Sequence, residues 1–499
     1  MKKSTLSRNA MANVFQMGLS AVLLFLLYRY LASNIGVTKL GIWSVVLASA
    51  SASRLANMGL SASVTRFVAK YIALEEPRRA AEAIETAALT LAVILALVLP
   101  VVYPLLFKIL SYLFAADYLP DALSLLPYAL LSLWFSIVAE VFQSGLDGCQ
   151  RMDVRAGLVL AGQTLLLALA LCLVPHFGLI GLAWAQIGQG SFLLILGWWL
   201  LRRCLPQLIR MPWCWKRATF REMMGYGANV QLASLSMILF DPLTKALMAK
   251  FGGATAAGYF EIANQVVIKG RAIIVSANQA IVPKVAQLTE VMPQRLPTIY
   301  RDNMQLIALV TLPGCTLLFA WAGIASRILL GGFNAEFVFF MQIATLAWAL
   351  NTFASPAYFA NMGTGHVGWN TLSHVTMGGL NVILGFCLGS HFGAKGVVFG
   401  YAGSLIVGSW LLIAFFHKLN DVSWRALFSR EHFGLALTSI FILTYATFEA
   451  TVPVGDQYMR MAILLLLPLS TLGVSVWFHP LRKRLLSQVF GMPARWGAK

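Results

Sequence analysis

The sequence predicts an all-α polytopic membrane protein with about fourteen transmembrane helices, arranged as two parallel six-helix repeats around a central cavity plus two carboxy-terminal helices. Composition is the first reason, because 59% of the 499 residues are hydrophobic and only 11% are charged. The second reason is that the apolar segments lie near the ~20 residues that a helix needs to cross a bilayer. The third reason is an internal repeat that covers most of the chain.

The apolar segments follow one another closely along the whole chain. The first comes after Met1-Lys2-Lys3 and lacks an A-x-A cleavage pattern, so we expect a retained helix rather than a signal peptide. No gap between segments exceeds about 20 residues, which is too short for a soluble domain. Glycine and proline lie between and inside the segments, as expected for membrane helices that pack closely or bend. The predicted spans are 10–33, 40–62, 82–106, 122–147, 155–175, 179–201, 222–249, 256–282, 299–325, 335–361, 369–391, 396–417, 432–451 and 458–478.

Lysine and arginine gather in every second loop, which orients the chain by the positive-inside rule. The loop 202–221 shows the pattern best, with Arg202, Arg203, Arg210, Lys216, Arg217 and Arg221. We therefore expect both termini and this loop in the cytoplasm. The same asymmetry accounts for the net charge of +18, so the basic composition does not indicate a nucleic-acid partner.

Short motifs recur at a nearly constant offset of 215–218 residues. Ala12-Asn13-Val14 recurs as Ala228-Asn229-Val230, and His176-Phe177-Gly178 recurs as His391-Phe392-Gly393. Because the offset spans an even number of predicted helices, both copies have the same orientation in the membrane. We expect an amino-terminal lobe, a basic cytoplasmic linker, a carboxy-terminal lobe and a final segment with two further helices and a basic tail. Their predicted boundaries are 1–201, 202–221, 222–417 and 418–499.

Four basic residues lie inside predicted spans at matching positions of the two repeats. Arg54 corresponds to Arg271, each thirteen residues after a glycine that opens its span, and Arg29 corresponds to Lys245. An arginine at the bilayer midplane costs roughly 2.5–3.5 kcal/mol on insertion scales, so its presence indicates a function. A pseudo-twofold axis between the lobes would bring all four bases toward one cavity.

Polar residues follow these bases at helical spacing, which predicts a hydrated cavity lined by one face of each helix. The predicted polar lining is Ser51, Gln231, Asn264 and Asn278. The acids that could couple transport to an ion are Asp241, Glu261 and Glu140.

Each of these residues has a structural alternative. Asp241 and Lys245, at positions i and i+4, could form a plain ion pair, and Glu261 could pair with a neighbouring base. Arg29 could reach the outer headgroups instead of the cavity. Lys269 points away from Arg271 on an ideal helix, so we assign it to an interface or a helix edge.

The chemistry of such a cavity is that of an anion site. Guanidinium and ammonium groups in a low-dielectric cleft attract anions, and the planar arginine fork matches phosphate oxygens. The six cysteines have no metal-ligand spacing, and no catalytic constellation is evident. The sequence therefore predicts a cavity for a phosphate-bearing substrate, with no catalytic residues, no metal and no cofactor.

The chain resembles the polysaccharide flippases of the multidrug/oligosaccharidyl-lipid/polysaccharide exporter superfamily. The resemblance rests on the duplicated spans, on Gly41-Ile42-Trp43 and Gly258-Tyr259-Phe260, and on Asn57-Met58-Gly59-Leu60 before a basic loop. It implies translocation of an undecaprenyl-pyrophosphate-linked oligosaccharide across the bacterial inner membrane by alternating access, for cell-surface polysaccharide synthesis.

The resemblance also implies roles for particular residues and partners. Arg54 and Arg271 would hold the pyrophosphate, with Arg29 and Lys245 assisting. The partners would be the lipid-linked glycan, membrane lipids, a polysaccharide polymerase and a chain-length regulator.

Three other functions remain open at this point. The two extra helices are similar to those of the lipid II flippase branch, and a drug or metabolite exporter would share the fold. A membrane polysaccharide polymerase fits less well, because the longest outer loop, about 107–121, carries few ionisable residues and the duplication would have no purpose.

Overall fold

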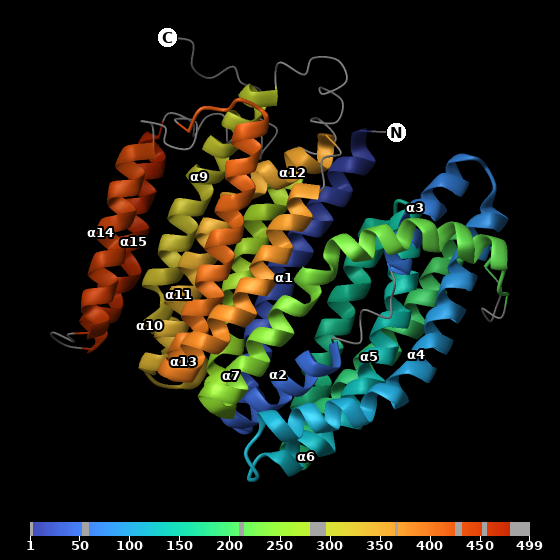
Figure 1. Ribbon diagram of the computed structural model, residues 1–499, viewed down its shortest axis with the longest axis horizontal. Helices are drawn as coiled ribbons and strands as arrows, with labels where there is room; N and C mark the ends of the chain where they lie inside the picture. The colour runs from blue at the N-terminus through green and yellow to red at the C-terminus, as the bar shows by residue number, and fades with distance from the viewer. Residues whose placement is uncertain are drawn as a thin grey trace. The chain divides into compact units, whose positions relative to one another are not determined.

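The structure, a computed structural model, describes residues 3–51, 59–208, 214–279, 296–364, 368–424, 432–451 and 457–479. Nearly all of these residues are helical, and no strand occurs among them (Figure 1). The predicted all-α class is therefore confirmed. Six described helices are long and apolar enough to cross a membrane, or seven if the bent pair α11–α12 counts as one span. The protein is thus a multi-pass membrane protein, while the number of fourteen spans stays a prediction.

Contacts divide the chain into two compact units. The first comprises Met1–Glu261 with Phe386–Val397, and the second comprises Ile262–Gly385 with Val398–Lys499. This division differs from the one drawn from the repeat, so the predicted lobe boundaries stay a prediction. The helices that begin in the first unit are α1 (Lys3–Asn34), α2 (Val37–Ser51), α3 (Leu60–Ala73), α4 (Pro77–Leu113), α5 (Leu119–Gly148), α6 (Met152–Cys204) and α7 (Arg217–Gln279).

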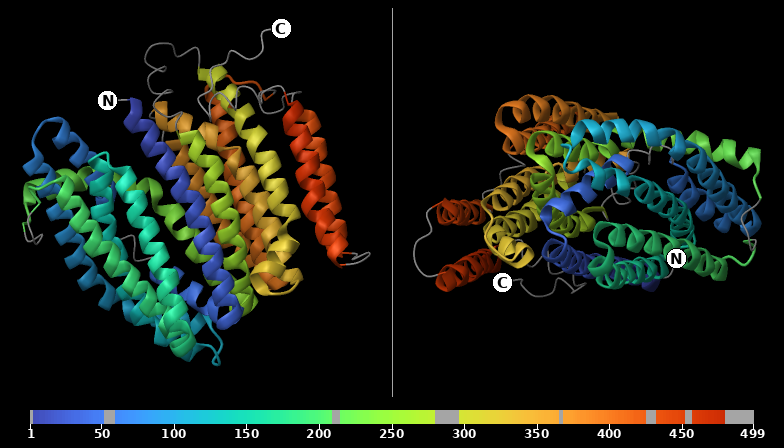
Figure 2. Two further views of the ribbon diagram at one scale, coloured as in Figure 1. Left: turned by 180° about the vertical axis from the view of Figure 1, so that it is seen from behind. Right: turned by 90° about the horizontal axis from the view of Figure 1, so that it is seen from below.

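The second unit begins inside α7 and contains the remaining helices, apart from Phe386–Val397 of α13, which belong to the first unit. Its two last helices, α14 and α15, lie side by side in both views and pack on α9 (Figures 1 and 2). Leu309 and Phe319 of α9 meet Ile442 of α14 and Leu472 of α15 in a buried apolar cluster. The helices of this unit are α9 (Leu296–Ala320), α10 (Ala322–Leu330), α11 (Ala335–Thr352), α12 (Ser355–Thr364), α13 (Gly368–Leu419), α14 (Phe433–Thr451) and α15 (Gln457–Phe478).

Three long helices each contain two predicted spans and break at a glycine between them. α6 breaks at Gly178, α7 at Gly253 and α13 at Gly393, all with positive φ. Such a backbone is costly for any residue with a Cβ, so glycine is required there. These breaks fall between the predicted spans in all three helices.

The repeated His-Phe-Gly motif has the same local structure in both copies. Gly178 has φ 55° and Gly393 has φ 61°. The rings of His176 and Phe177 lie 6.3 Å apart at 68°, and those of His391 and Phe392 lie 6.4 Å apart at 65°. The two copies therefore turn the chain in the same way, which supports the predicted repeat at this position.

Within the first unit, α2 crosses α7 through Gly41 and Gly258, which are predicted repeat mates. A Cβ on Gly41 would overlap the backbone of Ala254 and Gly258, and one on Gly258 would overlap the backbone of Val37 and Gly41. Small residues let two helix backbones approach this closely in a membrane. The contact is reciprocal, so the mates meet each other as they would about a local twofold axis.

One turn to either side of these glycines, two further pairs of residues 217 apart in sequence are in contact through their side chains. The hydroxyls of Thr38 and Thr255 lie 2.8 Å apart. On the other side, Ser44 Oγ donates to Glu261 Oε2 at 2.9 Å. The crossing therefore places Glu261 against α2.

Candidate functional site

Several of the predicted site residues lie outside the part of the chain that the structure describes. Arg54 falls in the undescribed stretch 52–58, and the side chains of Gln231 and Asn278 are likewise not described. The predicted pairing of Arg54 with Arg271 therefore stays a prediction. The remaining candidates divide between the two units.

In the first unit, Lys245 forms an ion-pair cluster with two carboxylates, the buried Glu261 and the partly exposed Asp241. Its Nζ lies 2.6 Å from Glu261 Oε2 and 2.8 Å from Asp241 Oδ2. Glu261 also accepts hydrogen bonds from Tyr28, whose hydroxyl lies 2.6 Å from Oε1, and from Ser44. Both structural alternatives from the sequence are thus present, namely the Asp241–Lys245 pair and a basic partner for Glu261.

The break at Gly253 makes this cluster possible. Lys245 lies before the break and Glu261 after it, so the change of direction in α7 brings their side chains together. Lys245 is 7% exposed and Glu261 3%, so each needs the other, because an unpaired buried charge is very costly. With one base and two acids, these three side chains sum to one negative charge.

In the second unit, Arg271 contacts only neutral groups among the described residues. Its Nη2 donates to Asn351 Oδ1 at 2.7 Å, and its guanidinium carbon lies 4.5 Å from the centre of the Trp348 ring. Its Nε is buried and has no acceptor in the described part of the chain. No carboxylate among the described residues lies within ion-pair distance of Arg271.

Asn264, which was predicted to line the cavity, contacts the tryptophan that lies against Arg271. Its Oδ1 accepts from Tyr401, whose hydroxyl lies 2.9 Å away, and from Trp348 Nε1 at 3.3 Å. Asn264 is 2% exposed, so it acts as a buried acceptor that holds the Trp348 ring against Arg271.

The other candidates contribute less to either cluster. Arg29 is exposed on α1, and no described acid pairs with it. Ser51 is half-buried and donates to Ala48 O of its own helix at 2.7 Å. Glu140 is half-buried on α5. For Arg29, both the cavity and the headgroup assignments remain open.

Sequence reasoning missed Trp348 and Asn351, which lie on one face of α11 at positions i and i+3. An amide one turn after a tryptophan, within a mostly apolar helix, was the available signal. The sequence alone did not connect them to Arg271, because 80 residues separate Asn351 from that arginine.

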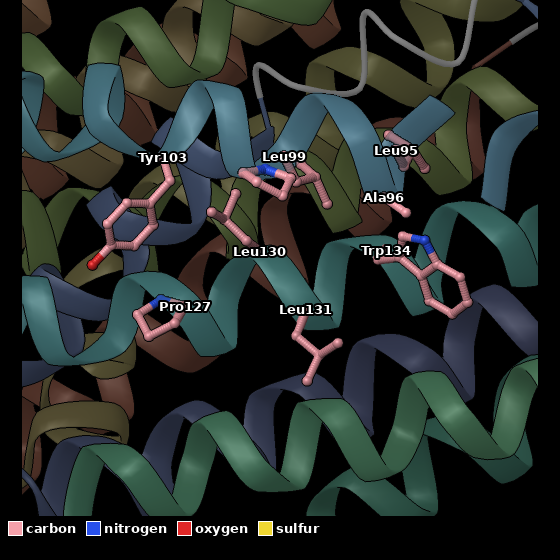
Figure 3. A pocket seen from close by; sticks show the side chains of 9 residues that line it. Leu95, Ala96, Leu99, Tyr103, Pro127, Leu130, Leu131 and Trp134 are labelled. Carbon is pink, nitrogen blue, oxygen red and sulfur yellow. The ribbon is translucent and has the colours of Figure 1, made fainter. Parts of the chain in front are cut away.

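An apolar cavity lies between α4 and α5 of the first unit (Figure 3). Its volume is about 600 Å³, and Leu99, Tyr103, Pro127, Leu131 and Trp134 are among its lining residues. The Trp134 indole donates to Ala92 O at 3.0 Å, so its polar group is already satisfied. None of the predicted site residues lines this cavity, and its apolar walls do not suit an anion.

Comparisons with known proteins give a family match and a shared fold. Residues 6–289 match a family described as polysaccharide biosynthesis protein. No curated protein matches the chain. Among solved structures, an inward-facing multidrug resistance MATE family transporter of the MOP superfamily is 14% identical, with a TM-score of 0.71 over 82% of this chain and 98% of that chain.

Two further solved structures share the fold. The lipid II flippase MurJ in an inward closed conformation is 12% identical, with a TM-score of 0.72 over 94% of this chain and 97% of that chain. A MOP superfamily transporter from Pyrococcus furiosus Vc1 is 13% identical, with a TM-score of 0.55 over 84% and 95%. Identities this low show the fold alone.

Proposed function

The chain belongs to the family of polysaccharide biosynthesis proteins, and we propose that it is a flippase for an undecaprenyl-pyrophosphate-linked oligosaccharide. The substrate would cross the bacterial cytoplasmic membrane by alternating access, for the synthesis of a surface polysaccharide. The diphosphate head group would enter the protein while the polyprenyl tail stays in lipid. No covalent step is needed.

The observation that carries this proposal is the state of Arg271. It lies inside a predicted span, and its described partners, Asn351 and Trp348, are both uncharged. A buried guanidinium is costly unless an anion pairs with it, and phosphate oxygens match its planar donors. Arg271 therefore supports an anionic substrate group.

The other bases have graded roles in this proposal. Arg54 would act with Arg271 on the diphosphate, and Arg29 would assist. Lys245 is held by two carboxylates, so it would reach the substrate only after leaving Glu261 and Asp241. Protonation or cation binding at Asp241, Glu261 or Glu140 would couple the cycle to an ion.

Two other classes of substrate, organic cations and lipid II, can be compared with the proposed one on the same residues. An exporter of organic cations would present free carboxylates to its cargo, whereas Asp241 and Glu261 both contact Lys245. A lipid II flippase would carry the same diphosphate chemistry, and MurJ shares the fold. The proposed substrate keeps the polysaccharide assignment because the family match points there.

The setting of this function follows from the same proposal. The protein would lie in the inner membrane with both termini in the cytoplasm, beside a polysaccharide polymerase and a chain-length regulator. Its enzymatic partners would perform all bond formation.

The test is translocation of the lipid-linked oligosaccharide in proteoliposomes that contain the purified protein. Arg271→Ala and Arg54→Ala should lose head-group translocation, because each removes a charge that binds the diphosphate. Lys269→Ala is the matched control, since it removes a positive charge two residues from Arg271 on the same helix and should keep translocation. Wild-type rates for both arginine variants, with normal membrane insertion, would contradict the proposal.

A further inference from the structure

The guanidinium of Arg271 is aimed by Asn351, and a chain of hydrogen bonds fixes which way this amide points. Ser409 Oγ donates its hydrogen to Leu405 O at 2.6 Å, so the same oxygen can only accept from another group. Asn351 Nδ2 donates to it at 2.8 Å. The amide nitrogen is therefore committed to Ser409, and the amide oxygen must face Arg271.

This arrangement satisfies the arginine without neutralising it. Asn351 Oδ1 lies 2.7 Å from Arg271 Nη2, a distance at which a carboxylate would form a strong ion pair. Aspartate has the same shape as asparagine, so a carboxylate would fit this position. The amide accepts the hydrogen bond but leaves the positive charge available to a ligand.

The rest of the scaffold follows the same pattern. Trp348 lies under the guanidinium, and Asn264 holds Trp348 through its indole nitrogen. Tyr401 donates to the same Asn264 oxygen. Every described group that orients Arg271 is therefore an aromatic ring, an amide or a hydroxyl.

We propose that Asn351 is the positioning and charge-selecting residue of the Arg271 site. It holds Arg271 in a fixed orientation while keeping the site cationic, and so selects a ligand that carries phosphate or diphosphate. This inference rests on the proposed function and names the residue that sets the charge of its site.

The experiment compares Asn351→Asp with Asn351→Ala in two assays. The first measures binding of undecaprenyl pyrophosphate, and the second measures translocation of the lipid-linked oligosaccharide in proteoliposomes. Asn351→Asp keeps the shape and adds a charge, so it should weaken binding at neutral pH by more than about tenfold. Asn351→Ala removes the contact but adds no charge, so its loss should be smaller. Only the Asn351→Asp variant should recover as the pH falls, because protonation removes the introduced charge.

Asn334→Asp is the matched control for a carboxylate added to the same helix. Asn334 caps α11 by accepting from the Phe337 N–H at 2.8 Å, and aspartate caps equally well there. This variant should bind and transport like the wild type. Thermal unfolding of each variant in detergent separates misfolding from loss of binding, and recovery at low pH cannot come from an unfolded protein.

The outcomes separate this inference from the proposed function. If Arg271→Ala loses translocation but Asn351→Asp binds and transports like the wild type, the role of Asn351 is wrong and the proposed function stands. Equal losses in Asn351→Asp and Asn351→Ala, with no recovery at low pH, would also reduce Asn351 to a packing residue. If Arg271→Ala transports normally, the proposed function itself fails.

Discussion

Replacing Lys245 by methionine would remove the ammonium group from the ion-pair cluster while keeping most of the side-chain volume. Glu261 would then lose a partner at 2.6 Å and Asp241 one at 2.8 Å. Removing one partner of a buried ion pair costs about 3–5 kcal/mol. Glu261 keeps its hydrogen bonds from Tyr28 and Ser44, and the Asp241 side chain is 44% exposed, so we expect about 3 kcal/mol.

The measurement is the free energy of unfolding in a double-mutant cycle. Lys245→Met and Glu261→Gln should each destabilise the protein, and the double variant should be more stable than the sum predicts, by about 1–3 kcal/mol. Lys269→Met is the control, because no described acid pairs with Lys269 and its loss should cost little. Strict additivity in the cycle would refute the reasoning that these two side chains neutralise each other.

Three further predictions concern the backbone and a thiol. Gly41→Ala should lower the melting temperature, because a Cβ there overlaps the backbone of α7. Gly157→Ala should not, because a Cβ there meets open space. Equal melting temperatures of the two variants would disprove the close crossing. Gly178→Ala and Gly393→Ala should each cost about 1–2 kcal/mol in unfolding experiments, since both glycines have positive φ, and a neutral effect at either would mean that its break is not required. Burial raises the pKa of Cys149 to about 11. In a variant with no other cysteine, the folded protein should therefore react with maleimide at pH 8 about a hundredfold more slowly than the unfolded protein. Equal rates would show an accessible thiol.

The helical architecture was predictable because its signals are local. Gly178, Gly253 and Gly393 fall between pairs of predicted spans, and each has a backbone conformation that glycine adopts without strain. The repeated His-Phe-Gly motif precedes a predicted span in both copies, and the structure has the same local geometry at both places. Hydrophobic periodicity and glycine placement were sufficient for these features.

The partners of the charged residues were less predictable because they come from distant parts of the chain. The Asp241–Lys245 pair follows from helical spacing, whereas the Lys245–Glu261 contact depends on how α7 changes direction at Gly253. The surroundings of Arg271 depend on α11 and α13, which no local pattern connects to it. Sequence therefore identified the costly residues, and the fold decided which of them are neutralised.

The crossing of α2 and α7 also bears on how the two copies diverged. About a twofold axis, corresponding residues of the two repeats contact each other, so identical residues at such a position must be able to pack together. Thr38 and Thr255 do so, as do Gly41 and Gly258. A carboxylate cannot face its own copy without sharing a proton. Glu261, which meets Ser44, is thus compatible with only one of the two copies. On the predicted duplication, this position is one at which the two copies differ in charge, with a hydroxyl in one and a carboxylate in the other.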